Sequence, residues 1–134
     1  MTVNSVLLDT HVTWWLGYQP EKLSQASIQS IRASSAKREG IAVSAATVYE
    51  LVWLFQRGRI SAKDTPTNFL NEIKRRFVIL PVDGAIAERA ASLPGPFHGD
   101  PMDRIIVSTA LVTGRVLVTA DQAILSSNIC LTSW

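Results

Sequence analysis

The sequence predicts a three-layer α/β/α fold, in which helices cover both faces of a central, mostly parallel sheet of four to five strands. Short apolar runs typical of buried strands alternate along the 134 residues with longer stretches of helical periodicity. Capping residues and helix breakers stand between these segments, where changes of element are expected. No linker, repeat or shift in composition divides the chain, so we expect a single domain over residues 1–134.

The predicted strands are short and almost entirely apolar. They span residues 3–8, 41–43, 77–82, 116–119 and, near the end of the chain, about 129–131. Strands that are apolar on both faces are typical of parallel sheets buried between two layers of helices. Because parallel neighbours need a long crossover connection, the segments between these strands are expected to be helical.

Each predicted helix has a start or stop signal. Ser44 is a good N-cap for a helix that ends at Gly58, and Thr65 followed by Pro66 begins the next one. Asp83 caps a later helix, and residues 94–99 form a loop because they contain two prolines and two glycines. The predicted helices span about residues 10–16, 23–38, 45–57, 66–75, 84–93 and 101–113, with a short one after residue 121.

Composition limits the class of protein. Apolar residues make up 47% of the chain and charged residues 18%, and no uncharged apolar stretch reaches the length that crosses a bilayer. The N-terminus has no basic segment before its first predicted strand, so we expect a cytoplasmic protein without a membrane partner. Cys130 is the only cysteine, which excludes an internal disulfide and a cysteine-based zinc site.

Five acidic residues stand where carboxylates are costly. Asp9 closes an apolar strand, Glu50 interrupts a nearly all-apolar helix, Asp100 and Asp103 open another helix, and Asp121 follows the fourth strand. A buried, isolated carboxylate either becomes neutral or finds a cation. Since the carboxyl ends of parallel strands meet at one edge of a sheet, we expect these acids to converge there on a divalent cation.

Each of these acids also has a structural explanation when it is taken alone. Asp100 is a good helix cap with Asp103 in the first turn, Asp121 suits the cap of the last helix, and Glu50 has one strip through which to reach solvent. Asp9 is the hardest to explain in this way, because its strand is apolar on both faces. The joint pattern therefore carries the prediction of a site.

The ligand types indicate the metal. Carboxylate oxygens suit Mg²⁺ or Mn²⁺, and Mg²⁺ keeps several waters, so few protein ligands are needed. His11 and His98 are the only histidines, and their spacing forms no histidine ligand pair, which argues against zinc.

The ordered set of motifs resembles a PIN domain and, more narrowly, the toxin ribonucleases of VapBC toxin–antitoxin pairs. The motifs are Asp9-Thr10-His11, the helix-borne Glu50, the run His98-Gly99-Asp100-Pro101-Met102-Asp103-Arg104, and Val118-Thr119-Ala120-Asp121. The resemblance covers the whole chain. It implies a PIN-like fold with a pocket whose catalytic and metal-binding acids are Asp9, Glu50, Asp103 and Asp121.

The resemblance also implies roles within this pocket. Asp9 and Asp103 are the expected direct metal ligands, and Thr10 and Thr119 are placed to orient the acids through hydrogen bonds. Three roles stay open for Asp100, which can cap the helix, support a metal ligand or line the pocket itself.

The implied activity is hydrolysis of RNA phosphodiester bonds by a Mg²⁺- or Mn²⁺-dependent endoribonuclease, the toxin of a type II pair. The implied partners are the RNA substrate, a cognate VapB-like antitoxin and a second copy of the chain in a homodimer. Arg57, Arg59 and Arg104 are candidates for contacts to the RNA backbone, and Lys63 belongs to the same basic cluster as the first two. Cations at helix C-termini are also favoured by the helix dipole.

The sequence is also compatible with two other functions. A non-catalytic RNA-binding or scaffold PIN module and an RNA-maturation nuclease outside a toxin–antitoxin pair are the alternatives. An aspartate-nucleophile phosphatase is disfavoured because position 11 is histidine where a second aspartate is expected, and a phosphoacceptor domain is disfavoured because no lysine follows Val118 closely. The sequence does not identify the RNA that is cut.

Overall fold

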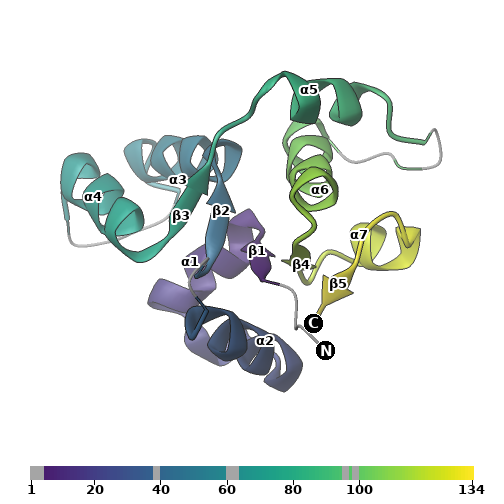
Figure 1. Cartoon of the computed structure of the whole chain (residues 1–134). Helices are drawn as coiled ribbons and strands as arrows, with labels where there is room; N and C mark the ends of the chain where they lie inside the picture. The colour runs from purple at the N-terminus through teal and green to yellow at the C-terminus, as the bar shows by residue number, and fades with distance from the viewer. Residues whose placement is uncertain (1–4, 38–39, 60–63, 95–96, 98–99) are drawn as a thin grey trace.

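The computed structural model describes residues 5–37, 40–59, 64–94, 97 and 100–134. Its centre is a five-stranded sheet in which all paired strands are parallel, in the order β3-β2-β1-β4-β5 (Figure 1). The strands are β1 Val6–Leu8, β2 Ala42–Ser44, β3 Val78–Leu80, β4 Val116–Val118 and β5 Thr132–Ser133. The predicted class of fold is confirmed, with five strands.

Every connection between consecutive strands contains at least one helix. In the described part these are α1 Thr10–Tyr18, η1 Pro20–Lys22, α2 Gln25–Ser35, α3 Ala45–Gln56, α4 Pro66–Arg76, α5 Gly84–Ala91, α6 Pro101–Thr113 and α7 Gln122–Ser127. The predicted caps Ser44, Thr65 and Asp83 each accept a hydrogen bond from a backbone N–H in the first turn of their helix.

Several predicted boundaries were wrong, most clearly those of the last strand and the second helix. The last strand is Thr132–Ser133, whereas the prediction placed it on the apolar residues 129–131. Asn128 ends α7 with a left-handed backbone (φ 55°), so the next residues turn back toward the sheet before pairing begins at Thr132. The second helix begins at Gln25 after Ser24 as its cap, because the short 3₁₀ helix η1 occupies residues just before it.

Some predictions fall on residues outside the described part of the chain. These are the first residues of the strand predicted at 3–8, Arg38 at the end of the helix predicted at 23–38, and the residues Lys63, His98 and Gly99. The helix itself ends at Ser35, earlier than predicted.

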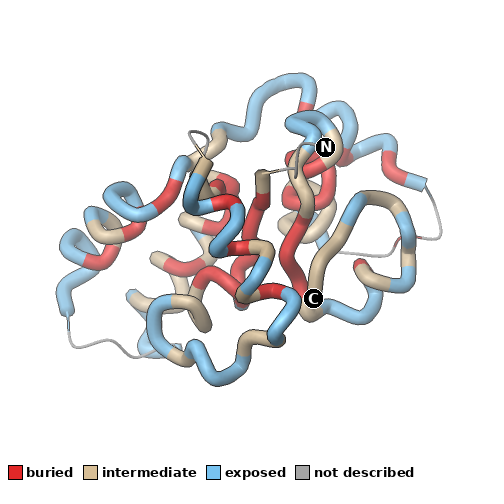
Figure 2. Tube along the Cα trace, turned by 60° about the horizontal axis from the view of Figure 1, so that its bottom comes forward, coloured by how far each residue is buried: buried red, intermediate tan, exposed pale blue. Residues whose placement is uncertain are grey.

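The sheet separates two hydrophobic cores, as the alternation of side chains along a strand requires. Val6 and Leu8 of β1 face a core with α1, α2, α3 and α4, whereas Leu7 between them faces a second core. Ile106 of α6 and Ile124 of α7 belong to that second core. Figure 2 shows the buried segments gathered in the central strands and on the inner sides of the helices that cover them.

The order of the strands creates a switch point at the centre of the sheet. From β1 the chain moves to β2 and β3 on one side and later returns to β4 on the other side of β1. Connections therefore leave the carboxyl ends of β1 and β4 in opposite directions, and such a point is where open parallel sheets bind ligands. No helix in the described part of the chain is long and apolar enough to cross a membrane.

Candidate active site

A pocket of about 350 Å³ opens at this switch point. It brings together all five acids that the sequence singled out, although they come from four separate segments of the chain. Its lining residues are Asp9, Thr10, His11, Trp15, Glu50, Asp100, Asp103, Ala120 and Asp121.

Three of the pocket aspartates also cap helices. Oδ1 of Asp9 accepts a hydrogen bond from the Val12 backbone N–H at 2.9 Å and so begins α1. Asp100 caps α6 through the N–H of Asp103 (2.9 Å), and Asp121 caps α7 in the same way. These hydrogen bonds hold the three carboxylates at the N-termini of α1, α6 and α7. Asp100 has two of its three open roles at once, since it caps α6 and lines the pocket.

Thr119 joins the two aspartates that follow the central strands. Its Oγ1 donates a hydrogen bond to Oδ2 of Asp9 and accepts one from the backbone N–H of Asp121 at 3.1 Å. Thr119 is fully buried, so this arrangement is protected from water. The hydroxyl therefore fixes the relative positions of the ends of β1 and β4 beneath the pocket.

Glu50 is held by a second threonine. Oγ1 of Thr10 donates to Oε1 of Glu50 at 2.7 Å and lies 3.2 Å from Oγ1 of Thr47. Thr47 stands one turn before Glu50 on α3, and sequence reasoning did not include it. Its spacing of three residues from Glu50 was the available signal, because residues i and i+3 share a helix face.

The acids influence one another strongly. Burial raises the pKa of Asp103 to about 6, assisted by the negative charges of the other pocket acids, Asp100, Asp121, Glu50 and Asp9. Burial also raises the pKa of Asp9, while the hydrogen bonds from Thr119 and Val12 oppose that shift. No pocket acid forms an ion pair with a cation in the described part of the chain. The pocket therefore concentrates negative charge that its described surroundings leave uncompensated.

This charge and the ligand chemistry fit a hard divalent cation. Every acidic side chain in the pocket offers oxygen, the ligand atom that Mg²⁺ and Mn²⁺ prefer. Among the described residues, no three acidic, histidine or cysteine side chains form a closed metal-binding group. An ion that keeps several of its waters needs only one or two direct carboxylates, and the volume of the pocket leaves room for those waters.

His11, Trp15 and Ala120 also line the pocket, although the sequence did not assign them to it. His11 is exposed in the first turn of α1, and its ring lies 5.9 Å from that of Trp15, one turn later. Trp15 in turn contacts the ring of Trp134 at 5.8 Å. The spacing of His11 from the strand-end Asp9 was a signal for its position, whereas the contact with Trp134 depends on the tertiary fold.

Two hollows continue from the pocket. One, of about 290 Å³, shares Glu50 with it and lies against Tyr49, Trp53 and Met102. A larger one, of about 860 Å³, shares Asp100 and Asp103 and extends toward Arg89 and α7. The acids therefore stand in the middle of an extended concave surface.

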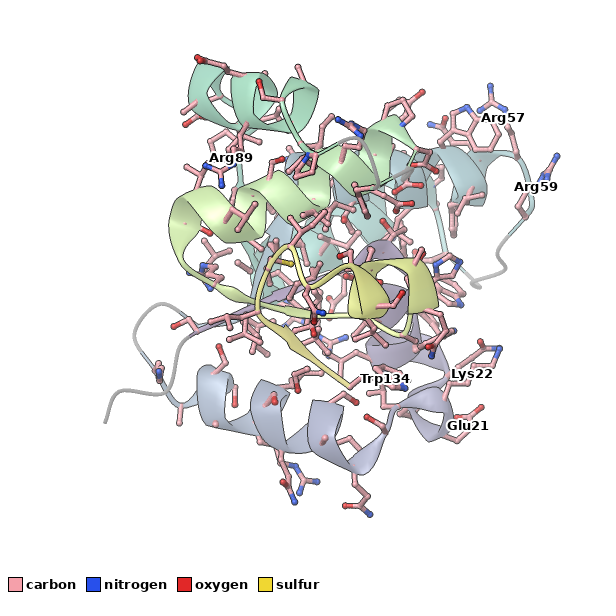
Figure 3. The ribbon with its side chains drawn as sticks, turned by 90° about the vertical axis from the view of Figure 1, so that its right-hand side faces the viewer. Glu21, Lys22, Arg57, Arg59, Arg89 and Trp134 are labelled. Carbon is pink, nitrogen blue, oxygen red and sulfur yellow. The ribbon has the colours of Figure 1, made fainter. Side chains whose placement is uncertain are left out.

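The three arginines considered for RNA contacts have different surroundings. Arg57 and Arg59 are exposed and project from the end of α3 at one border of the molecule (Figure 3). The Arg57 guanidinium lies over the ring of Trp53, 4.1 Å from its centroid. Arg104 instead donates hydrogen bonds to the backbone carbonyls of Ala90 (3.0 Å), Phe97 (3.0 Å) and Leu93 (3.4 Å). Arg104 thus fastens α6 to the end of α5.

Comparisons with known proteins agree with this architecture. The family model of the PIN domain matches residues 6–126. The chain is 34% identical over 124 residues to ribonuclease VapC22 of Mycobacterium tuberculosis, a match that covers 92% of each chain.

Solved structures share the fold at low sequence identity. VapBC2 from Rickettsia felis, bound to a DNA fragment from its promoter, has a TM-score of 0.71 at 16% identity and covers 95% of this chain and 96% of that one. DNA-bound VapBC from Salmonella typhimurium also has a TM-score of 0.71, at 17% identity, with 97% of both chains covered. The match of nearly the whole chain to the family model, together with the sheet order and the extent of the VapC22 alignment, shows that this chain belongs to the PIN domain family.

Proposed function

We propose that this chain is a metal-dependent endoribonuclease of the VapC type, the toxin of a type II toxin–antitoxin pair. The observation that carries the proposal is the meeting of Asp9, Glu50, Asp103 and Asp121 in one pocket at the switch point of the sheet. The extended similarity to a ribonuclease supports the activity, and the fold shared with toxin–antitoxin structures is in keeping with the toxin assignment.

Asp9 and Asp103 would hold the metal, Mg²⁺ or Mn²⁺, as direct ligands, and Glu50 and Asp121 would complete the site. When bound, such an ion lowers the pKa of a coordinated water and stabilises negative charge on the phosphate. Thr119 and Thr10 orient Asp9 and Glu50. The uncompensated acids would repel RNA without the ion, so substrate and metal bind together.

The side chains around the pocket position the RNA. Arg57 and Arg59 contact phosphates beyond the acids, where their exposed guanidinium groups are available. Arg104 is left out of this surface because backbone carbonyls already occupy three of its donors. Arg89, at the far side of the larger hollow, provides a cation on the opposite side of the acids.

The proposed partners are a cognate VapB-like antitoxin and a second copy of the chain, in the cytoplasm. Trp14 and Tyr18 of α1 form an aromatic cluster with Phe69 of α4, and this cluster offers an apolar surface for such a partner. Trp14 stacks on the exposed Tyr18 with 4.1 Å between the ring centroids.

Metal replacement tests the activity directly. The purified protein is treated with EDTA, dialysed and assayed on total RNA with added Mg²⁺ or Mn²⁺, and the 5′ ends of the products are sequenced. We expect cleavage to return with either ion. Asp9→Asn and Asp103→Asn should lower it by at least about 100-fold while circular dichroism shows an unchanged fold.

Asp83→Asn makes the same exchange at a helix cap outside the pocket and serves as the matched control. If both pocket variants cut RNA like the parent, the assignment of the site is wrong. A parent protein that binds RNA and leaves it intact would instead favour the non-catalytic scaffold.

A further inference from the structure

We propose that the 290 Å³ hollow beside the acid pocket holds one unpaired nucleobase, next to the phosphate that is cut. This inference rests on the proposed ribonuclease activity and names the residues that would contact the base beside the cut.

The hollow adjoins the acids directly. Its lining residues are Tyr49, Glu50, Trp53, Leu54 and Met102. Glu50 also lines the acid pocket, so one side chain forms a wall of both cavities. A phosphate held at the acids therefore has its neighbouring nucleoside within reach of this hollow, without a gap along the strand.

The walls suit the flat face of a base. Tyr49 and Trp53 are four residues apart on α3 and so lie on one face of the helix. Tyr49 is 57% exposed, so its ring is accessible to a ligand in the hollow. Met102, from the first turn of α6, faces the hollow with a polarisable thioether. Aromatic side chains beside a nucleic-acid path stack with any base, because every base has a π-face.

The charges near the hollow favour nucleic acid over an apolar protein segment. Arg57 lies over the Trp53 ring, which holds the guanidinium in place while it stays exposed to solvent. Arg59 follows two residues later at the same border (Figure 3). The surface therefore presents, in order, the proposed metal-binding acids, the aromatic hollow and the stacked arginine. That order matches the alternation of phosphate and base along a strand.

A second copy of the chain is the competing occupant. A symmetric contact uses the same patch on both copies, so it would bring two copies each of Arg57 and Arg59 to one interface. Like charges at an interface disfavour that contact. The observations therefore favour a base in the hollow, and the experiment separates the two occupants.

The experiment is a substitution cycle between the protein and the RNA. A short RNA that the parent protein cleaves is prepared in three forms. One form is intact, and each of the other two lacks the base of one nucleotide next to the cut, on the 5′ side or on the 3′ side. Single-turnover kcat/KM is measured for the parent and for Tyr49→Ala. We expect one abasic position to lower the parent rate by roughly 5- to 100-fold, and Tyr49→Ala to lower the rate on intact RNA by a similar factor.

The two losses should not multiply. Tyr49→Ala should cleave the abasic RNA about as fast as the intact RNA, because the stacking partner is already gone. Tyr49→Phe keeps the aromatic face and should behave like the parent. Leu131→Ala, which removes another exposed large apolar side chain outside the hollow, is the matched control and should keep the full abasic effect.

The outcomes are distinct. If the loss of rate from Tyr49→Ala and the loss from the abasic site multiply, the assignment of the hollow is wrong. The same holds if Tyr49→Ala cleaves intact RNA at the parent rate. Neither result would contradict the proposed ribonuclease activity. Conversion of a dimer to a monomer by Tyr49→Ala, measured by light scattering, with the abasic effect retained, would assign the hollow to a contact between two copies. A parent that cleaves no RNA would remove the proposed function together with this inference.

Discussion

At the scale of single residues, Thr119 has an effect beyond its size. Its hydroxyl links Asp9 to the backbone of Asp121, although the side chain itself does not line the pocket. Groups that orient metal-binding side chains typically change metal affinity or activity by 10- to 100-fold when they are removed. Thr119 is therefore expected to matter for catalysis without contacting RNA or metal.

Thr119→Val should lower cleavage by about 10- to 100-fold and raise the Mg²⁺ concentration that gives half-maximal activity. The cause is a misdirected Asp9 carboxylate, whose pKa also rises further when the hydrogen bond from Thr119 is lost. Titration of activity with Mg²⁺ at several pH values measures both effects. Thr119→Ser keeps the hydroxyl and should restore most of the activity. An unchanged Mg²⁺ requirement in the valine variant would contradict this role.

Asp103 destabilises the metal-free protein at neutral pH. Its pKa is raised to about 6 in the folded state, above that of an ordinary unfolded aspartate. The folded state therefore binds the proton more tightly, and stability falls as the pH rises from about 4 through 6. In EDTA at pH 7.5, Asp103→Asn should raise the free energy of unfolding by about 1 kcal/mol, after allowance for solvent screening, and by little at pH 4.

Urea denaturation of the parent and the variant at the two pH values measures this difference. Asp83→Asn provides the same exchange at a cap outside the pocket. Equal stabilisation by both substitutions would show that the pocket charges are not the cause.

At the scale of elements, local signals were enough for most helices. Ser44, Thr65 and Asp83 were predicted as caps and are caps, because a cap depends only on the first turn that follows it. Gly114 ends α6 with a positive φ of 68°, as its position after the periodic run indicated. The prediction of β5 was wrong because its position depends on pairing with β4, which a local pattern does not contain.

Ser34 joins α2 to the sheet in a way that the sequence did not reveal. Its Oγ accepts the backbone N–H of Val6 at 3.0 Å and donates to the carbonyl of Gly40 at 2.7 Å. Ser34→Ala should lower the free energy of unfolding by about 1–3 kcal/mol, because a buried N–H of β1 loses its partner. Ser35→Ala removes a neighbouring hydroxyl on the exposed side of the same helix and should have little effect. Similar losses from both, in urea denaturation, would contradict the role of Ser34.

At the scale of the whole molecule, the predicted fold and family are confirmed because they depend on alternation of strands and helices along the entire chain. The five acids were found from the sequence because a carboxylate next to an apolar run is unusual. The structure brings them together, and their catalytic and metal-binding roles stay predictions. Thr47 and Trp15 were missed, and Arg104 has a structural role, because their contacts come from packing between distant elements.

The distribution of charge predicts opposite effects of two salts. Five of the eleven acids line one pocket, so thirteen lysines and arginines face only six acids elsewhere. Monovalent salt should weaken RNA binding through counterion release. Mg²⁺ should instead strengthen it by about 10-fold or more when first added to EDTA-treated protein, because it neutralises the pocket.

Fluorescence anisotropy with a labelled single-stranded RNA measures this contrast, with KCl at matched ionic strength as the control. Ca²⁺ takes the same kind of ligands and should act like Mg²⁺ in binding. If Mg²⁺ weakens binding as KCl does, the acids do not face the bound RNA.

Asp9, Asp100 and Asp121 each cap a helix and also line the pocket, so substitutions at these positions can affect folding, activity or both. Asparagine caps a helix about as well as aspartate. A single base change converts an aspartate codon to an asparagine codon, so we expect that one mutation at Asp9 or Asp121 gives a folded protein without the proposed activity. Alanine at the same positions loses shape and chemistry together. We expect such a variant to stay folded and to compete with the parent protein for the proposed partners.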